Sequence, residues 1–212
     1  TKQLIKQLPW SDVGVLISIP TILATLHFLT PDSIYTGLWF YYNDPSVVSA
    51  WTSAYTHGGN RHLLYNLVSY TLTVGIAYWL LTVFVDARRV FWITFVFLLV
   101  LTPFITTAID YGLLYQYYEL FPSDTDSKGF SGIIGGLAGM TLGGIGVYIA
   151  RRYGVWPGIH SVIGVVLAAV GFLSVLHGTI SALTGLLLIF GLVVIGGMYL
   201  SFDEIRSWSQ IR

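Results

Sequence analysis

The sequence predicts an all-α polytopic membrane protein, a bundle of six transmembrane helices. Of its 212 residues, 55% are hydrophobic and only 9% are charged, and the mean hydropathy is +0.74. A soluble domain carries about 25% charged residues, so this chain cannot cover itself with a polar surface. Apolar stretches of about 20 residues, the length that crosses the hydrocarbon of a bilayer, recur along the chain.

Each expected helix follows from the length of an apolar stretch, because backbone groups in lipid must satisfy their own hydrogen bonds. The expected spans are residues 13–29, 61–84, 90–110, 129–150, 155–172 and 175–200. Pro20 in the first span favours a kink. The uncharged run between Arg152 and Asp203 is too long for one crossing, so we place a turn at Gly171. Without an internal repeat, residues 1–212 are expected to form a single domain.

The basic residues predict the orientation, since lysine and arginine are enriched in cytoplasmic loops. With an inside N-terminus, the outer segments hold only Arg61 and Lys128. The basic residues of the inner segments are Lys2, Lys6, Arg88, Arg89, Arg151, Arg152, Arg206 and Arg212. We therefore expect a multi-pass protein of the cell membrane with both termini in the cytoplasm.

The outer segment from Thr30 to Thr56 is rich in aromatic residues. They are Trp39, Phe40, Tyr41, Tyr42, Trp51 and Tyr55. Such residues are typical of an interfacial belt that anchors a protein at the membrane surface. They are equally compatible with a partly submerged loop that contacts a substrate or gates a site.

The second span begins with HGGNRHLLYN, which places polar side chains where they are costly and mark function. His62 and Asn66 are four residues apart and share one helical face. His57 precedes two glycines and Asn60, which is a predicted N-cap, so His57 is expected where this helix begins. The pattern predicts a polar site near the outer end of the second span.

Ser131 in the fourth span and His177 in the sixth are polar groups at a similar depth. Asn66 and Ser131 each lie 20 residues before a charge at the inner boundary, Asp86 and Arg151 respectively. At about 1.5 Å per residue, both are about 30 Å above that boundary. His177 also falls early in its span. A site between helices requires such a shared depth, and it is predicted toward the outer side.

The fourth span is also rich in glycine. Glycines four residues apart, which allow helices to approach closely, are Gly132 with Gly136, and Gly135 with Gly139 and Gly143. We expect Gly139 and Gly143 to serve packing only. Gly129 and Gly132 flank Ser131, where a bulky side chain would obstruct a substrate backbone.

Together these residues resemble the motifs of the rhomboid family of intramembrane serine proteases. The motifs are His-x4-His-x3-Asn at the start of the second helix, Gly-x-Ser-Gly at the start of the fourth and a histidine early in the sixth. The resemblance covers residues 10–200. It implies a six-helix rhomboid-like fold and a serine endopeptidase that cleaves transmembrane segments of other membrane proteins.

The resemblance also implies roles for individual residues. Ser131 would be the nucleophile and His177 its general base, which later protonates the leaving amine. The positions that match oxyanion-hole or substrate-binding residues are His62, Asn66, Gly129 and His57. Since no carboxylate is buried in a predicted span, a Ser-His dyad is expected. Gly135 departs from the family, which commonly has an aromatic residue there to support the catalytic histidine.

The sequence is also compatible with other functions. The main alternative is a non-proteolytic rhomboid-like factor that binds membrane proteins, although such proteins typically lack the serine or the histidine. A transporter using His57, His62 and His177 as a proton path lacks buried carboxylates and a repeated half. A histidine metal site would lack carboxylates too. We expect no cofactor and no metal. The expected partners are transmembrane protein substrates and the lipid bilayer, and no nucleic acid is expected to bind.

Overall fold

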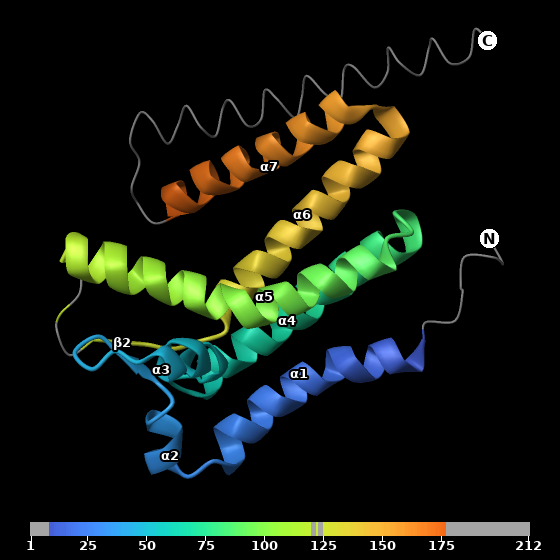
Figure 1. Ribbon diagram of the computed structural model, residues 1–212. Coiled ribbons are helices and arrows are strands. Elements are labelled where there is room, and N and C mark those ends of the chain that lie inside the picture. The colour runs from blue at the N-terminus through green and yellow to red at the C-terminus, as the bar shows by residue number, and fades with distance from the viewer. Residues whose placement is uncertain (1–8, 120–121, 123–124, 177–212) are drawn as a thin grey trace, which may run out of the picture. The chain divides into compact units, whose positions relative to one another are not determined.

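The structure is a computed structural model that describes residues 9–119, 122 and 125–176 (Figure 1). Within this part the chain is almost entirely helical. Four helices are long and apolar enough to cross a membrane: Trp10–Leu29, Asn60–Phe84, Arg88–Tyr117 and Ser131–Tyr153. The all-α class is therefore confirmed. Of the expected sixth span, 175–200, all but its first two residues lie outside the described residues, and so does His177.

The chain divides into two compact units, Thr1–Thr141 and Leu142–Arg212, called here the N-terminal and C-terminal units. The N-terminal unit contains α1 (Trp10–Leu29), α2 (Asp32–Thr36), β1 (Phe40–Tyr41), α3 (Val47–Thr52), η1 (Ser53–Tyr55), α4 (Asn60–Trp79), η2 (Leu80–Phe84), α5 (Arg88–Ala108), η3 (Ile109–Tyr117) and β2 (Asp126–Ser127). The boundary falls within α6 (Ser131–Tyr153), and α7 (Val155–Leu176) belongs to the C-terminal unit. η1 is a 3-10 helix, whereas η2 and η3 are π-helical.

The third span is longer than predicted, because η3 continues α5 past Asp110 to Tyr117. Tyr111 and Tyr115 on η3 stack on each other at 5.6 Å between ring centroids. Both also pack on Tyr42 from the outer segment, at 6.1 and 4.9 Å. These ring contacts stabilise the helix beyond the charged residue at which the sequence predicted its end.

The predicted turn at Gly171 is wrong, since α7 continues through this residue to Leu176. A glycine inside a helix costs only about 1 kcal/mol relative to alanine. No proline or capping residue follows Gly171 closely enough to stop the helix. The glycine alone was therefore insufficient evidence for a helix end.

In the described residues of the N-terminal unit, α1 lies antiparallel to α4 and is joined to it by hydrogen bonds at three levels. The pairs are Tyr78 with Asp12 at 2.6 Å, Tyr70 with the Leu16 carbonyl at 3.0 Å, and His27 with Asn60 at 2.8 Å. Arg88 at the start of α5 adds two hydrogen bonds to the buried Asp12 carboxylate, at 2.8 and 2.5 Å. Together these bonds fix the register of α1 on α4.

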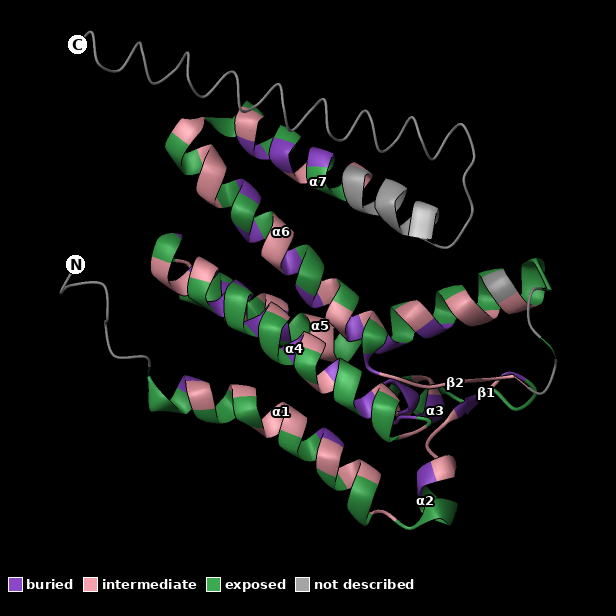
Figure 2. Cartoon of the chain, turned by 180° about the vertical axis from the view of Figure 1, so that it is seen from behind, coloured by how far each residue is buried: buried purple, intermediate pink, exposed green. Residues whose placement is uncertain are grey.

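One face of α4 is buried, and its buried residues are coloured purple in Figure 2. Its members recur every three or four residues, as a helix facing a core requires. They are Leu63, Asn66, Tyr70, Val74, Ala77 and Tyr78. Asn66 is therefore a polar residue on an otherwise mainly apolar and aromatic face.

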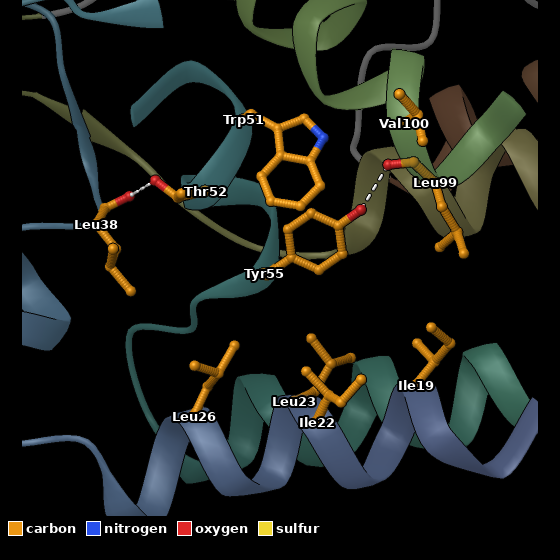
Figure 3. A pocket seen from close by; sticks show the side chains of 10 residues that line it. All are labelled: Ile19, Ile22, Leu23, Leu26, Leu38, Trp51, Thr52, Tyr55, Leu99 and Val100. Carbon is orange, nitrogen blue, oxygen red and sulfur yellow. Dashed lines mark hydrogen bonds between the residues drawn. The ribbon is translucent and has the colours of Figure 1, made fainter. Parts of the chain in front are cut away.

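Each of two prolines inside helices leaves one backbone carbonyl without its helical hydrogen bond. In both cases a tyrosine hydroxyl from another element donates a hydrogen bond to that carbonyl. Pro20 has no N–H for the Leu16 carbonyl, and the Tyr70 hydroxyl donates to that carbonyl instead. Pro103 likewise leaves the Leu99 carbonyl free. The Tyr55 hydroxyl from η1 donates to it at 2.5 Å (Figure 3). In the hydrocarbon of a bilayer, a backbone carbonyl without a hydrogen-bond donor would destabilise the fold by several kcal/mol.

Two glycines in the first half of α6 lie against α5. A Cβ at Gly132 would lie 2.7 Å from Thr106, and a Cβ at Gly136 would lie 2.7 Å from Leu98. The close approach predicted for this pair is confirmed. At Gly139 and Gly143, by contrast, no described atom lies within 4 Å of such a Cβ, so the expected packing role is not seen there.

We predict that Tyr70→Phe lowers the free energy of unfolding by about 1–3 kcal/mol, because the Leu16 carbonyl loses its donor. In a Pro20→Ala background the loss should fall below about 0.5 kcal/mol, since the amide restored at position 20 takes that carbonyl. The measurement is a double-mutant cycle by denaturant unfolding of the detergent-solubilised protein.

The matched control is Tyr55→Phe, which removes the donor of the Leu99 carbonyl. Pro103→Ala should rescue Tyr55→Phe, whereas Pro20→Ala should not. Rescue of either tyrosine variant by either proline variant would show that the two hydroxyls do not act on specific carbonyls.

Candidate functional site

The start of α6 is held in place by the outer segment. β2 pairs antiparallel with β1, so that Ser127 lies opposite Phe40. Two residues later the Gly129 N–H donates to the Ser53 carbonyl at 3.0 Å. Phe130 is fully buried and packs against Tyr55 and Tyr70. These contacts determine where α6 begins, and Ser131 is its first residue.

Gly129 brings the backbone before Ser131 against α4. Its φ of +126° lies in the region that glycine tolerates best. A Cβ at this position would lie 2.6 Å from Cε1 of His62, too close for any side chain. The sequence predicted that Gly129 keeps space for a substrate, but in the structure the neighbour that needs this space is the His62 imidazole.

Ser131 differs from other hydroxyl residues on the long helices. Ser18, Thr71 and Thr141 each donate to a carbonyl three or four residues earlier in their own helix. Ser131 opens its helix, so no earlier helical turn is available to its hydroxyl. Among the described residues the Ser131 hydroxyl makes no hydrogen bond, and the residue is exposed. The common structural role of a serine in a membrane helix therefore does not apply to it.

Of the predicted partners, His62 on α4 lies directly against this segment at Gly129. His62 is half-buried, and the ring of His57 lies edge-on to it at 5.2 Å. Asn66 is 5% exposed and lies one helical turn beyond His62. Its Nδ2 has no partner within the described part of the chain. A buried N–H without a partner destabilises the fold by about 1–3 kcal/mol. Such a donor therefore calls for an explanation, and a role in binding a ligand is one.

His57 is buried with both ring nitrogens unpartnered among the described residues. Its backbone N–H donates to the Tyr35 hydroxyl at 2.6 Å. The same hydroxyl bonds Nδ1 of His27 at 2.9 Å. Burial first, and then the neighbouring His62 and His27, lower the pKa of His57 from 6.5 to about 4. His57 is therefore neutral at physiological pH.

Asn60 does not act as the predicted N-cap. It is the first residue of α4, preceded by Gly59, and its side chain makes no capping hydrogen bond. Its Oδ1 instead pairs with Nε2 of His27 on α1. An amide oxygen only accepts, so His27 carries its proton on Nε2 and Nδ1 is free to accept from Tyr35. The tertiary contact with α1 replaces the local cap.

A cavity of about 340 Å³ opens beside Ser131. It is lined by Thr106, Ile109, Asp110, Ser127, Lys128, Gly129, Ser131 and Gly132. The sequence pattern identified Gly129, Gly132 and Ser131 but missed Asp110 and Lys128. Lys128 precedes the glycine motif directly, which was an available signal. Asp110 was placed at the outer end of the third span and not connected to the serine.

A second, larger pocket of about 490 Å³ lies between α1, α5 and the outer segment (Figure 3). Nearly all its walls are apolar, for example Ile22, Leu26 and Val100. The two hydroxyl groups that line it are already bonded, since Thr52 donates to the Leu38 carbonyl at 2.9 Å and Tyr55 donates to the Leu99 carbonyl. This pocket has no group that could act on a peptide, so the cavity beside Ser131 is the candidate site.

Comparison of the chain with models of known protein families, with curated proteins and with solved structures finds no match. Among the described residues, no group of three or more histidine, cysteine, aspartate or glutamate side chains is placed to hold a metal ion. The function must therefore be argued from the chemistry of Ser131 and its neighbours.

We predict that the neutral state of His57 makes stability fall in acid. As the pH drops from 6.5 toward 4, the unfolded chain binds a proton at His57 that the folded chain does not. The free energy of unfolding should fall over this window by up to about 3 kcal/mol, with no contribution above it. The measurement is denaturant unfolding of wild type and His57→Gln across these pH values.

The groups that face His57, namely His27, His62 and Tyr35, are retained in His57→Gln, so the difference between the two profiles isolates His57. His160→Gln, which changes an exposed histidine on α7, is the control and should follow wild type. Parallel profiles for wild type and His57→Gln would show that the folded His57 titrates normally.

Proposed function

We propose that this chain is a rhomboid-type intramembrane serine endopeptidase that cleaves transmembrane segments of other membrane proteins. The observation that carries the proposal is the state of Ser131. The residue is exposed and lines a polar cavity at the start of a membrane-length helix, and its hydroxyl makes no hydrogen bond among the described residues. We further propose six spans, both termini in the cytoplasm and a site toward the outer side.

The proposed reaction begins when Ser131 Oγ attacks the carbonyl carbon of the scissile bond and gives its proton to His177. The tetrahedral intermediate carries an oxyanion. Donors for it would be the His62 and Asn66 side chains and the backbone N–H of Ser131, and each donor contributes about 3–4 kcal/mol. Collapse of the intermediate breaks the C–N bond, with the proton passing from His177 to the leaving amine. Water then hydrolyses the acyl-enzyme.

Three features of the N-terminal unit support these roles. Ser131 opens α6, where backbone N–H groups have no intrahelical partner and the helix dipole favours negative charge. His62 lies against Gly129, two residues before the serine. The buried Nδ2 of Asn66 is an unused donor among the described residues. These are the groups that stabilisation of an oxyanion requires.

We expect a fluorophosphonate probe to label the detergent-solubilised protein at Ser131. Ser131→Ala should abolish both labelling and cleavage of a model transmembrane substrate, because the hydroxyl is the nucleophile. Mass spectrometry locates the label, and gel analysis follows the cleavage. Ser18→Ala, which changes a serine bonded within α1, is the matched control and should behave as wild type.

Cleavage that survives in pure Ser131→Ala protein would overturn the assignment. Label found on Ser127, which also lines the cavity, would move the nucleophile there. A folded wild-type protein that is neither labelled nor active, yet still binds the substrate, would favour the non-proteolytic binding factor.

We also expect His177→Ala to lose cleavage by a factor of at least about 10², since the serine then has no general base. Thermal unfolding should show that the variant is folded. His62→Ala is the comparison, because removal of an oxyanion donor lowers kcat by about 10²–10³ without removing the base from the pH profile. Normal turnover of His177→Ala, with the base titration lost in His62→Ala instead, would make His62 the base.

A further inference from the structure

The cavity beside Ser131 has an uncompensated negative charge. Lys128 lines the cavity, but its ammonium forms an ion pair with Asp126 and lies 3.7 Å from the ring centroid of Trp39. Asp110 also lines the cavity, and its carboxylate has no hydrogen bond or ion pair among the described residues. With Lys128 neutralised by Asp126, the charge of Asp110 remains.

Asp110 is held on a well-anchored element. It is the second residue of η3, which continues the membrane-length helix α5. The neighbouring Tyr111 packs on Phe40 at 5.6 Å and on Tyr42 at 6.1 Å. Asp110 is half-buried, so it is shielded from water more than a surface carboxylate. A charge in such a position interacts more strongly than one on the surface.

A neighbouring group responds to this negative charge. Tyr42 lies outside the spanning helices and is buried. Burial first, and then the carboxylates of Asp110 and Asp126, raise the pKa of its phenol. Burial disfavours a charge of either sign, but the contribution of the two carboxylates has the sign of a negative potential, which favours a positive group.

We propose that Asp110 selects substrates that carry a lysine or arginine beside the scissile bond. This inference rests on the proposed function, since the cavity is the one that Ser131 lines. An ammonium or guanidinium group that enters the cavity pairs with the Asp110 carboxylate. An acidic side chain is repelled there. Membrane segments commonly end in lysine or arginine with long apolar stems, which suits a site near the membrane boundary.

The test uses model transmembrane substrates whose scissile bond has been mapped by mass spectrometry. They differ in one residue beside that bond, which is lysine, glutamine or glutamate. Wild type should cleave the lysine substrate with a kcat/KM at least about tenfold above that of the glutamate substrate. Asp110→Asn should bring this ratio close to one, and Asp110→Lys should invert it.

Glu119→Gln is the matched control, because Glu119 is an exposed acid just beyond η3 that does not line the cavity. It should keep the wild-type ratio. The dependence of the preference on salt can be measured on the wild-type protein alone. Added salt should reduce the lysine preference of wild type, since it screens the pairing. A preference that ignores salt, or that Glu119→Gln removes as fully as Asp110→Asn does, would overturn the inference.

Failure of this inference can be distinguished from failure of the proposed function. Equal cleavage of the three substrates by wild type contradicts the role of Asp110 but upholds the peptidase. If nothing is cleaved, the peptidase fails, and binding of the same three peptides to Ser131→Ala protein in nanodiscs decides the role of Asp110. The role of Asp110 is supported if the lysine peptide binds at least about tenfold more tightly than the glutamate peptide and if the Ser131→Ala, Asp110→Asn double variant shows no such difference. Equal binding of the two peptides to Ser131→Ala protein refutes this role.

Discussion

Hydrocarbon offers no hydrogen-bond partner to a free backbone carbonyl, and the N-terminal unit is organised around two carbonyls that prolines leave free. The hydroxyl of Tyr70 from α4 donates to one of them, and that of Tyr55 from η1 donates to the other. Both rings also contact Phe130, at 5.9 and 5.7 Å between centroids. Phe130 directly precedes Ser131. The groups that satisfy the backbone in the membrane therefore also determine where α6 begins, and with it the position of the candidate nucleophile.

The same segment explains why Ser131 is available for chemistry. A hydroxyl further along a membrane helix usually bonds a carbonyl of the preceding turn, as Thr141 does within α6. The strand pair β1–β2 and the bond from Gly129 to Ser53 keep the chain extended up to Phe130. Because the helix begins at Ser131, its hydroxyl has no such carbonyl, and the neighbouring amides point out of the helix end. A fixed helix start thus supplies both a hydroxyl without a helical partner and N–H donors beside it.

Hydropathy predicted the four helices of membrane length among the described residues, because the length of an apolar stretch is a property of the local sequence. The spacing of His62 and Asn66 also predicted correctly that they share one face of α4. What the sequence could not show depends on contacts between distant segments. The extension of α5 to Tyr117 depends on Tyr42, and the side chain of Asn60 pairs with His27 instead of capping its own helix. Asp110 ends the predicted span 90–110, and hydropathy alone carries no information on its contact with the cavity beside Ser131.

The protonation of the histidines bears directly on the charge of the cavity. His57 contacts His62, which in turn lies against Gly129 in the cavity wall. Burial keeps the pKa of His57 near 4, so this histidine adds no positive charge at physiological pH. A charged His57 would oppose the entry of a basic side chain and offset the Asp110 carboxylate. The burial that destabilises the fold in acid therefore also keeps a positive charge away from His62 at physiological pH.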